Sequence, residues 1–303
     1  NILESYDPKT NAWTSLTNIP TPRANTAAAV LHDKLYVIGG SNANGRLSVV
    51  EVFDPQTKQW STSQPLSSAL SHCTAIGYGD RILVFGGEDS SNQKSDKVYE
   101  FNPSNSTWTN IATMPSARYS VKLAILEDRI WVIGGSTGAN RLKLVESFDP
   151  AAKTWRTEPE LNFERHSAAA CSFGDRILVF GGISQNGTFY SSVESFTKGE
   201  TAWTNQGNLP ESKFNADAAV LDGKVYVVAG TNGSGSSNKV FAADITPPMD
   251  LYFRDANATG TITLDKLAGA VASKLDGNAS ALPPIGAVTA IDHHDAPPAD
   301  HAV

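Results

Sequence analysis

The chain of 303 residues contains only two cysteines, too few for a disulfide framework. No apolar run approaches the roughly 18 residues that a membrane-spanning helix needs, and the first residues lack the pattern of a secretion signal. Positive charge is also scarce, because 24 lysines and arginines stand against 31 aspartates and glutamates, a net charge of −7. We therefore expect neither a nucleic-acid partner held by bulk charge nor insertion into a membrane.

The sequence does contain a regular internal repeat. The nine residues GDRILVFGG occur at Gly79–Gly87 and again, unchanged, at Gly174–Gly182. Weaker copies end at Gly40, Gly135 and Gly230, so the ends follow one another at intervals of 47–48 residues. A fixed period of this length indicates an array of structural repeats.

Each repeat is predicted to form four short strands joined by turns. In the repeat that starts at Arg118, the segment SVKLAIL is followed by a turn at Glu127-Asp128 and then by IWVIGG, LVESFDP and a strand that carries Trp155. The apolar residues of IWVIGG run without alternation, which is typical of a strand covered on both faces. The paired glycines indicate positive φ or a close backbone approach. Because a sheet with two apolar faces must stack on neighbours, we expect a closed ring of sheets, a β-propeller.

Aromatic residues recur in step with the repeat. We expect them to form the core between neighbouring sheets, because they keep the same place in every copy. They are the tryptophans Trp13, Trp60, Trp108, Trp155 and Trp203, and the residues Tyr6, Phe53, Phe101, Phe148 and Phe196 that directly precede the DP dipeptide or its equivalent.

These motifs closely resemble the kelch repeat. The kelch marks are a double glycine after an apolar strand, a V-E-x-[YF]-D-P segment, a tryptophan some six residues on, and an arginine that opens the next repeat. They stand here as VEVFDPQTKQW at Val50–Trp60, VESFDPAAKTW at Val145–Trp155 and MPSAR at Met114–Arg118. The resemblance covers residues 1 to about 245 and implies an all-β, kelch-type propeller of four-stranded blades, of the bacterial secreted or surface type.

The number of blades is less firmly predicted. Four repeats are complete, at about 23–69, 70–117, 118–164 and 165–212, and a fifth supplies three strands at 213–245, with Ala229 in place of a glycine. Two further strands, Ile2–Asp7 and Ala12–Leu16, could finish the fifth blade and give five blades, or could be the remnant of a sixth. Kelch propellers usually have six or seven blades, so we expect six, with the first one truncated.

The rest of the chain is predicted to lie outside the propeller. Residues 1–245 form the propeller, 246–262 a linker, 263–276 a short amphipathic helix, and 277–303 a disordered tail rich in alanine and proline. The sequence opens within a repeat, so we expect a piece of a longer protein, located outside the cell or at its surface, with a monomeric propeller.

A pairing of charges is visible when the repeats are compared with one another. The residues that open the repeats, which we call the blade-start residues, are Arg23, Leu70, Arg118, Arg165 and Lys213; the third strands carry Glu51, Tyr99, Glu146, Glu194 and Phe241. Repeats one, three and four have both Arg and Glu, and repeat two has neither. Loss of one partner would leave the charge of the other buried and unpaired. We therefore predict that Arg and Glu form an ion pair within a blade.

Binding is expected on the loops, because the strands are uniform and the loops vary. One variable set, the post-glycine loops, comprises Ser41–Arg46, Glu88–Asp96, Ser136–Arg141, Ile183–Tyr190 and Thr231–Asn238; the other, the blade-start turns, is formed by the two residues after each blade-start residue. In the kelch proteins that this chain resembles, both sets form one partner-binding face. Aromatic, Arg and Asn side chains suit such a face, although solvated loop residues remain the alternative. The resulting candidates are Asn25, Arg46, His72, Tyr119, Arg141, His166, Phe189, Tyr190, Phe214 and Asn215.

Enzymatic alternatives have less support. Kelch-type copper oxidases such as galactose oxidase need a Tyr–Cys crosslink beside the metal, whereas Cys73 and Cys171 occupy small or apolar core positions, so we expect inert buried thiols, no metal and no cofactor. Sugar mutarotases also use a kelch fold, but they need an acid and a base in the channel, and the candidate positions contain no carboxylate. We expect a non-catalytic module that binds a protein or glycan, with a carbohydrate-active enzyme or a structural stalk domain as alternatives.

Overall fold

The computed structural model describes residues 2–245 and 254–255. Within these residues all regular structure is β, as predicted, and no helix long and apolar enough to cross a bilayer is present among them. The helix predicted at 263–276 and the tail at 277–303 lie outside the described residues. Of the predicted linker at 246–262, only Arg254–Asp255 is described, and this pair forms strand β26.

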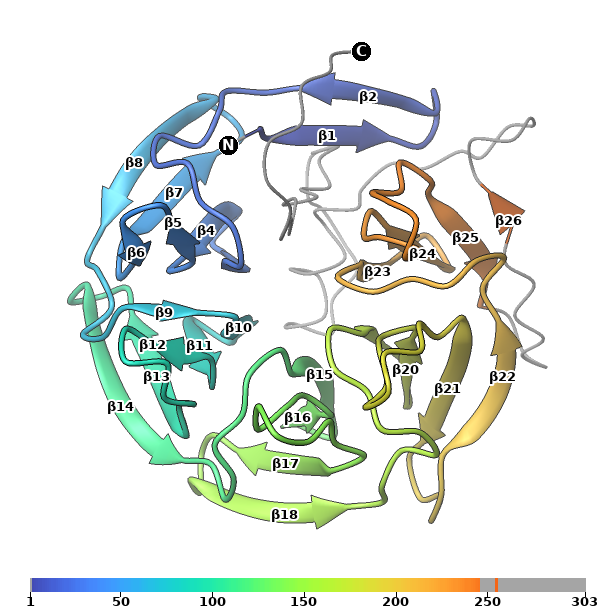
Figure 1. Cartoon of the computed structure of the whole chain (residues 1–303). Coiled ribbons are helices and arrows are strands. Elements are labelled where there is room, and N and C mark those ends of the chain that lie inside the picture. The colour runs from blue at the N-terminus through green and yellow to red at the C-terminus, as the bar shows by residue number, and fades with distance from the viewer. Residues whose placement is uncertain (1, 246–253, 256–303) are drawn as a thin grey trace.

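Five four-stranded antiparallel sheets surround a central axis, and each runs in chain order from an inner to an outer strand (Figure 1). Their strands are β3 (Ala27–Leu31), β4 (Lys34–Ile38), β7 (Val50–Asp54) and β8 (Gln59–Ser63) in blade one; β10 (Thr74–Tyr78), β11 (Arg81–Phe85), β13 (Lys97–Asn102) and β14 (Thr107–Thr113) in blade two; β15 (Lys122–Leu126), β16 (Arg129–Ile133), β17 (Val145–Asp149) and β18 (Thr154–Glu158) in blade three; β19 (Ala169–Phe173), β20 (Arg176–Phe180), β21 (Ser192–Thr197) and β22 (Thr204–Asn208) in blade four; β23 (Asp217–Leu221), β24 (Lys224–Val228), β25 (Phe241–Asp244) and β26 in blade five.

The first two strands, β1 (Glu4–Asp7) and β2 (Ala12–Ser15), form a separate hairpin on the ring between blades five and one (Figure 1). Tyr6 is fully buried against apolar side chains of blade five, and Leu3 packs on apolar side chains of blade one. The hairpin therefore does not finish blade five, whose outer strand is β26. The described residues contain five complete blades, and the expected sixth is represented by this hairpin alone.

The glycine pairs allow the close backbone approach that the sequence indicates. The N–H of the second glycine donates to the carbonyl oxygen of the next blade-start residue, at 3.0 Å from Gly135 to Arg165, and three other pairs do the same. The first glycine has φ of +59° at Gly134, and a Cβ there would lie 2.4 Å from the Arg165 carbonyl oxygen. The remaining three bonds join Gly40 to Leu70, Gly87 to Arg118 and Gly182 to Lys213.

The aromatic residues fill the space between blades, as predicted, with one exception. The indole N–H of Trp108 donates to the Gln64 carbonyl oxygen of the preceding blade at 2.9 Å, and Trp203 does the same to Pro159 at 2.8 Å. Trp13 is 36% exposed, so its prediction as a core residue is wrong. The hairpin places Trp13 on its outer strand, where it contacts the Tyr6 ring at 5.0 Å.

The predicted pairing of arginine with glutamate is confirmed in all three blades that carry both. Arg118 and Glu146 lie 2.9 Å apart with side chains 0% and 6% exposed, and matching ion pairs join Arg23 to Glu51 at 2.7 Å and Arg165 to Glu194. In blade two, Leu70 and Tyr99 share an apolar cluster instead. In blade five the ammonium of Lys213 lies 5.0 Å from the centroid of the Phe241 ring. Each pair fixes the start of its blade beneath the loops.

Candidate binding face at the channel mouth

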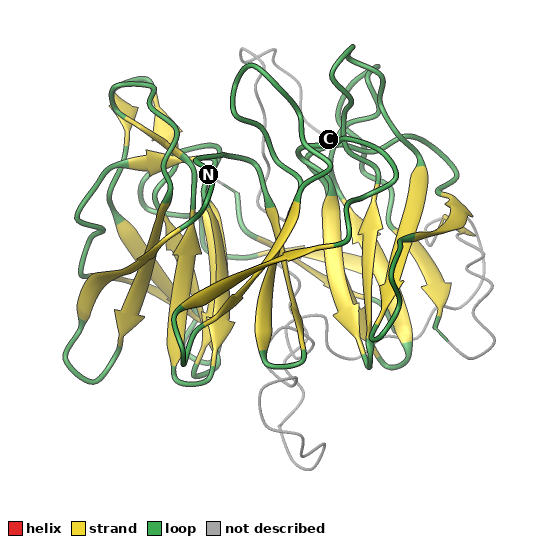
Figure 2. Cartoon of the chain, turned by 90° about the horizontal axis from the view of Figure 1, so that it is seen from below, coloured by secondary structure: helices red, strands yellow, loops and turns green. Residues whose placement is uncertain are grey.

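Both loop sets lie at one end of the propeller, and tight turns close the other end (Figure 2). In each of four blades, two backbone hydrogen bonds join the first residue of the blade-start turn to the residue after the glycine pair, as between Tyr119 and Ser136 at 3.0 and 2.9 Å. The same bridge joins His166 to Ile183 and Phe214 to Thr231. We call this end of the molecule the loop face.

A series of backbone hydrogen bonds runs from blade to blade around the channel mouth. The second residue of each blade-start turn has φ between +51° and +55°, and its N–H donates to the carbonyl oxygen of the equivalent residue one blade earlier. The series begins at Asn25, which accepts from His72 at 2.9 Å, and ends at Asn215, which donates to Ser167 at 2.8 Å. Asn25 is only 8% exposed, so it contributes to the loop face mainly through its backbone.

A carboxylate held by two cations lies beside the mouth. Glu88 forms ion pairs with Arg46 at 2.7 Å and with Lys94, and the Nδ1 atom of His72 lies 3.8 Å from it. Burial alone would raise the pKa of Glu88, but the hydrogen bonds from Lys94 and Arg46 outweigh burial and lower it. The Lys94 ammonium also lies 5.1 Å from the centroid of the Tyr119 ring, which links this cluster to blade three.

This carboxylate was not among the candidate residues, which contain no Asp or Glu. Glu88 directly follows a glycine pair, at the position occupied by Ser41, Ser136, Ile183 and Thr231 in the other repeats. Comparison of these five residues would have found it, because it alone carries a charge. Chemically it is a poor proton donor near neutral pH, since both cations favour its ionised form. The cluster is thus better suited to binding than to acid–base catalysis.

Three ring side chains that the sequence singled out lie in a row. The rings of His72 and Tyr119 are 5.7 Å apart, and those of Tyr119 and His166 are 6.3 Å apart. Burial, reinforced by Arg141 and His72, lowers the pKa of His166 to about 4. Among the residues that the structure describes, no group of three or more His, Cys, Asp or Glu side chains is arranged to hold a metal ion.

His166 gives a prediction about acid stability. Its pKa in the folded state lies near 4, below the ordinary value of about 6.5. The unfolded chain therefore takes up this proton first as the pH falls, so stability should be lost between about pH 6.5 and pH 4. His166→Gln should reduce this loss, measured as denaturation midpoints at several pH values, with the exposed His32→Gln as control. An NMR titration that placed the His166 imidazole near pH 6.5 would contradict the prediction.

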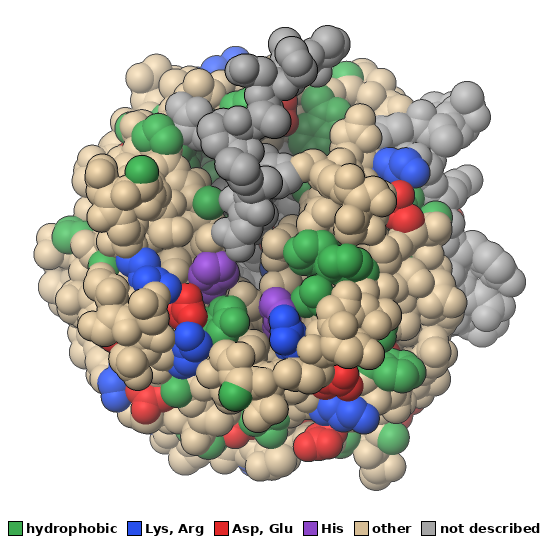
Figure 3. All heavy atoms as spheres, viewed as in Figure 1, with side chains coloured by type: hydrophobic (Ala, Val, Ile, Leu, Met, Phe, Trp, Pro, Cys, Tyr) green, Lys and Arg blue, Asp and Glu red, His purple; other side chains and the backbone are tan. Residues whose placement is uncertain are grey.

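Aromatic side chains gather on the part of the loop face formed by blades four and five. Phe189 and Phe214 stack with ring centroids 4.7 Å apart, and Tyr190 lies 5.7 Å from the ring of Phe163. Phe163 is 40% exposed. Figure 3 shows a group of apolar side chains on one side of the channel and a group of charged side chains on the other, with further charged side chains around the face. The loop face thus combines an aromatic patch with a separate charged cluster.

Phe163 was missed by the sequence reasoning. It stands two residues before its blade-start residue, where the other repeats carry Thr21, Ser68, Ser116 and Glu211. An apolar side chain at an otherwise polar loop position is a signal for a contact surface. Arg165 packs beneath this patch, with its guanidinium carbon 5.1 Å from the centroid of the Tyr190 ring.

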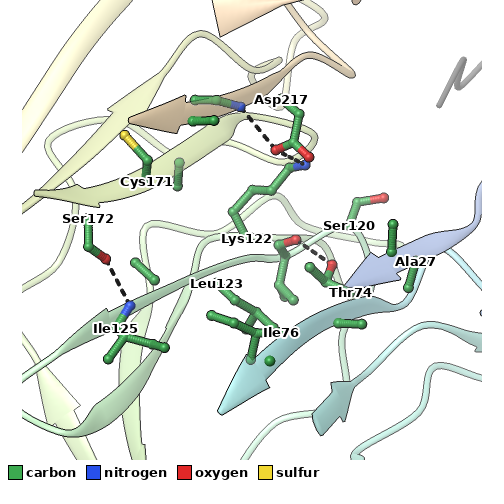
Figure 4. A pocket seen from close by; sticks show the side chains of 18 of the residues that line it. Ala27, Thr74, Ile76, Ser120, Lys122, Leu123, Ile125, Cys171, Ser172 and Asp217 are labelled. Atoms are coloured by element: carbon green, nitrogen blue, oxygen red, sulfur yellow. Dashed lines mark hydrogen bonds and ion pairs between the residues drawn. The ribbon is translucent and has the colours of Figure 1, made fainter. Parts of the chain in front are cut away.

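A cavity of about 570 Å³ follows the propeller axis below the mouth (Figure 4). Lys122 and Asp217 point into it and lie 3.3 Å apart, joining blades three and five. Both cysteines line this cavity and are buried thiols that form no disulfide, as predicted. Burial raises the pKa of Cys73 to about 12, so this thiol stays protonated and unreactive.

Comparison with known proteins agrees with this geometry. The chain matches the family model described as Kelch motif at residues 22–67 and 164–210, and the KLHDC2/KLHL20/DRC7 Kelch-repeats domain at residues 62–162. It is 28% identical over 256 residues to mouse Kelch-like protein 35, covering 82% of this chain and 36% of that protein. A stretch of 42 residues is 50% identical to the Xenopus laevis influenza virus NS1A-binding protein homolog, covering 14% of this chain and 7% of that protein.

A solved structure described as the structure of YjhT has a TM-score of 0.73 at 15% identity, and the match covers 80% of this chain and 88% of that one. At this level of identity the likeness shows the fold alone. The chain spans about a third of the length of the mouse relative, so the activity of that whole protein does not transfer to it.

Proposed function

The chain belongs to the kelch-repeat β-propellers, and we propose that it is a non-catalytic module that binds a protein partner on its loop face. Kelch propellers commonly serve as protein-binding modules. The observation that carries the proposal is the aromatic patch, in which Phe163, Phe189, Tyr190 and Phe214 come from three separate loops. Aromatic side chains beside arginines are the usual energetic centre of protein interfaces.

The charged cluster supports the same proposal. Arg46, Glu88 and Lys94 are each less than a quarter exposed and satisfy one another, so they form a fixed polar border rather than a mobile fringe. A partner that packed apolar side chains on the patch would meet this border across the channel mouth. A glycan is the alternative occupant, because stacked aromatic rings also suit sugar faces. An enzymatic function has less support, since Glu88 is held by two cations and Asp217 in the channel is paired with Lys122.

The proposal can be tested with matched surface variants. Proteins captured by the wild-type chain should bind Phe163→Ser/Phe189→Ser at least about tenfold more weakly, since buried interface aromatics are worth roughly 2 kcal/mol or more. The control is Ile2→Ser, which removes an exposed apolar side chain, 62% accessible, outside the loop face. Affinities of each captured protein for the three purified chains give the measurement.

Equal affinity of a captured protein for all three chains would place binding away from the loop face and contradict the proposal. A glycan array probed with the same chains separates the two occupants. Glycan binding that the double variant abolished, together with no protein partner, would replace the protein proposal by the glycan alternative.

A further inference from the structure

The β1–β2 hairpin has the geometry of the outer half of a blade. Tyr6 lies opposite Trp13 just as Phe53 lies opposite Trp60 in blade one. In blade one the inner edge of the third strand also pairs with the second strand, which places Phe53 opposite Leu35. Strand β1 pairs with β2 and with no other described strand. The ring thus holds a sixth position with outer strands but no described inner ones.

The walls of this position are apolar and resemble the other interfaces between blades. The hairpin covers Leu221 and Tyr226 on the side of blade five, and Leu35 and Phe53 on the side of blade one. Closer to the axis, the inner strand β23 of blade five carries Ala219, which is half-buried and packs against the same apolar cluster as Tyr6. The equivalent residues of the other interfaces are covered by a neighbouring inner strand.

Within the described part of the chain, two polar groups at this position lack the partners that their equivalents have. Glu4 occupies the place of Glu51, Glu146 and Glu194, each paired with its own blade-start arginine, yet no cation of the described chain pairs with Glu4. Gly230 occupies the place of the glycines that donate to the next blade-start carbonyl, and its N–H donates to no backbone oxygen within the described residues. A blade-start arginine or lysine inserted here would place its cation near the Glu4 carboxylate and its carbonyl oxygen near the Gly230 N–H.

We propose that the sixth position is a binding site for a β-hairpin of the inner-strand type, preceded by arginine or lysine, supplied by a partner polypeptide. The hairpin pairs its second strand with β1, fills the apolar walls with small and branched side chains, and places its cation on Glu4. Strand addition of this kind draws affinity from main-chain hydrogen bonds and specificity from alternate side chains. The site is distinct from the loop-face patch and does not depend on the proposed function.

The chain itself provides the probe. A labelled synthetic peptide with the sequence of residues 117–135 contains Arg118 and the inner strands of blade three. Its anisotropy with the full chain should show saturable one-to-one binding, and hydrogen exchange in residues 4–7 should slow when it binds. The peptide carrying Arg118→Leu should bind at least tenfold more weakly, because it leaves Glu4 without a cation. The Glu4→Leu chain should bind the two peptides equally well.

A substitution at Ala229 provides a second test, in which peptide binding is expected to become tighter rather than weaker. In the other blades the first glycine of the pair leaves room for the next blade-start carbonyl, and a Cβ at Gly86 would lie 2.3 Å from it. Ala229 carries such a Cβ, so it holds the incoming backbone away from its preferred place. Ala229→Gly should therefore tighten peptide binding, whereas most surface substitutions would leave it unchanged.

Three results would overturn the proposal. These are no saturable binding by the full chain, equal binding of the two peptides to the wild-type chain, and slow exchange, before any peptide is added, of the β1 amides that do not donate to β2. The third would assign the position to a segment of the chain's own polypeptide instead of a partner. Because the peptide substitution needs no change in the protein, misfolding of a variant cannot account for a negative outcome.

Discussion

Replacing Arg118 with leucine is expected to lower the free energy of unfolding by about 3–5 kcal/mol, because it leaves the carboxylate of Glu146 buried without a cation. The Glu146 side chain is only 6% exposed in the intact blade. Burial already raises its pKa, although Arg118 acts in the opposite direction. The loss is to be measured by denaturant unfolding, monitored by fluorescence of the tryptophans.

Adding Glu146→Tyr to Arg118→Leu should restore much of the lost unfolding free energy. Blade two carries leucine and tyrosine at the two positions, and Leu70 and Tyr99 are both buried in one apolar cluster. Arg118→Leu with Glu146→Tyr copies this arrangement and removes the stranded charge. We expect the double variant to be more stable than Arg118→Leu alone by roughly 2 kcal/mol, as in replacements of buried ion pairs by apolar residues. A double variant no more stable than the single one would refute the compensation.

The pH dependence of the stability loss in Arg118→Leu tests independently whether the unpaired Glu146 carboxylate causes it. In Arg118→Leu the folded-state pKa of Glu146 should lie above its unfolded value, because burial then acts without an opposing cation. The folded state consequently binds the proton more tightly, so the deficit against wild type should shrink as the pH falls through that raised pKa. A deficit that stayed constant from neutral to acid pH would show that lost packing, and not the stranded carboxylate, causes the instability.

The periodic part of the molecule could be predicted from the sequence because neighbouring blades impose the same constraint on each copy. The joint loss of Arg and Glu in repeat two was enough to predict the pairs that Arg23, Arg118 and Arg165 form. The glycine pairs likewise indicated close approach, and each adjoins a carbonyl oxygen. These features depend only on position within the repeat.

The features that the sequence did not reveal depend on the paths of single loops. Glu88 meets Arg46 from the preceding repeat and Lys94 from its own loop, and neither contact recurs in another blade. The patch around Phe163 also forms once, from three loops of unequal length. Trp13 has the spacing of a core residue, but it lies on a hairpin that is not part of a complete blade. The repeat spacing therefore predicted burial for a side chain that is exposed.

Gly134→Ala is expected to destabilise the protein by about 3–5 kcal/mol, through strain, a clash and a lost hydrogen bond. An alanine there adopts φ near +59°, its Cβ lies 2.4 Å from the Arg165 carbonyl oxygen, and the adjoining bond from Gly135 must lengthen. Gly174→Ala is the matched control, because Gly174 has φ of +56° but nothing within 4 Å of its Cβ position. It should cost about 1–2 kcal/mol, the conformational part alone.

The chain already contains one alanine at the first position of a pair, and it stands where the contact is missing. Ala229 has φ of +56°, and no blade-start carbonyl within the described residues adjoins it. The glycines of blades one to four are therefore required by the following blade rather than by the turn itself. If Gly134→Ala and Gly174→Ala lowered the unfolding free energy equally, φ alone would explain the glycines, and the blade-to-blade carbonyl contact would have no part in holding the ring together.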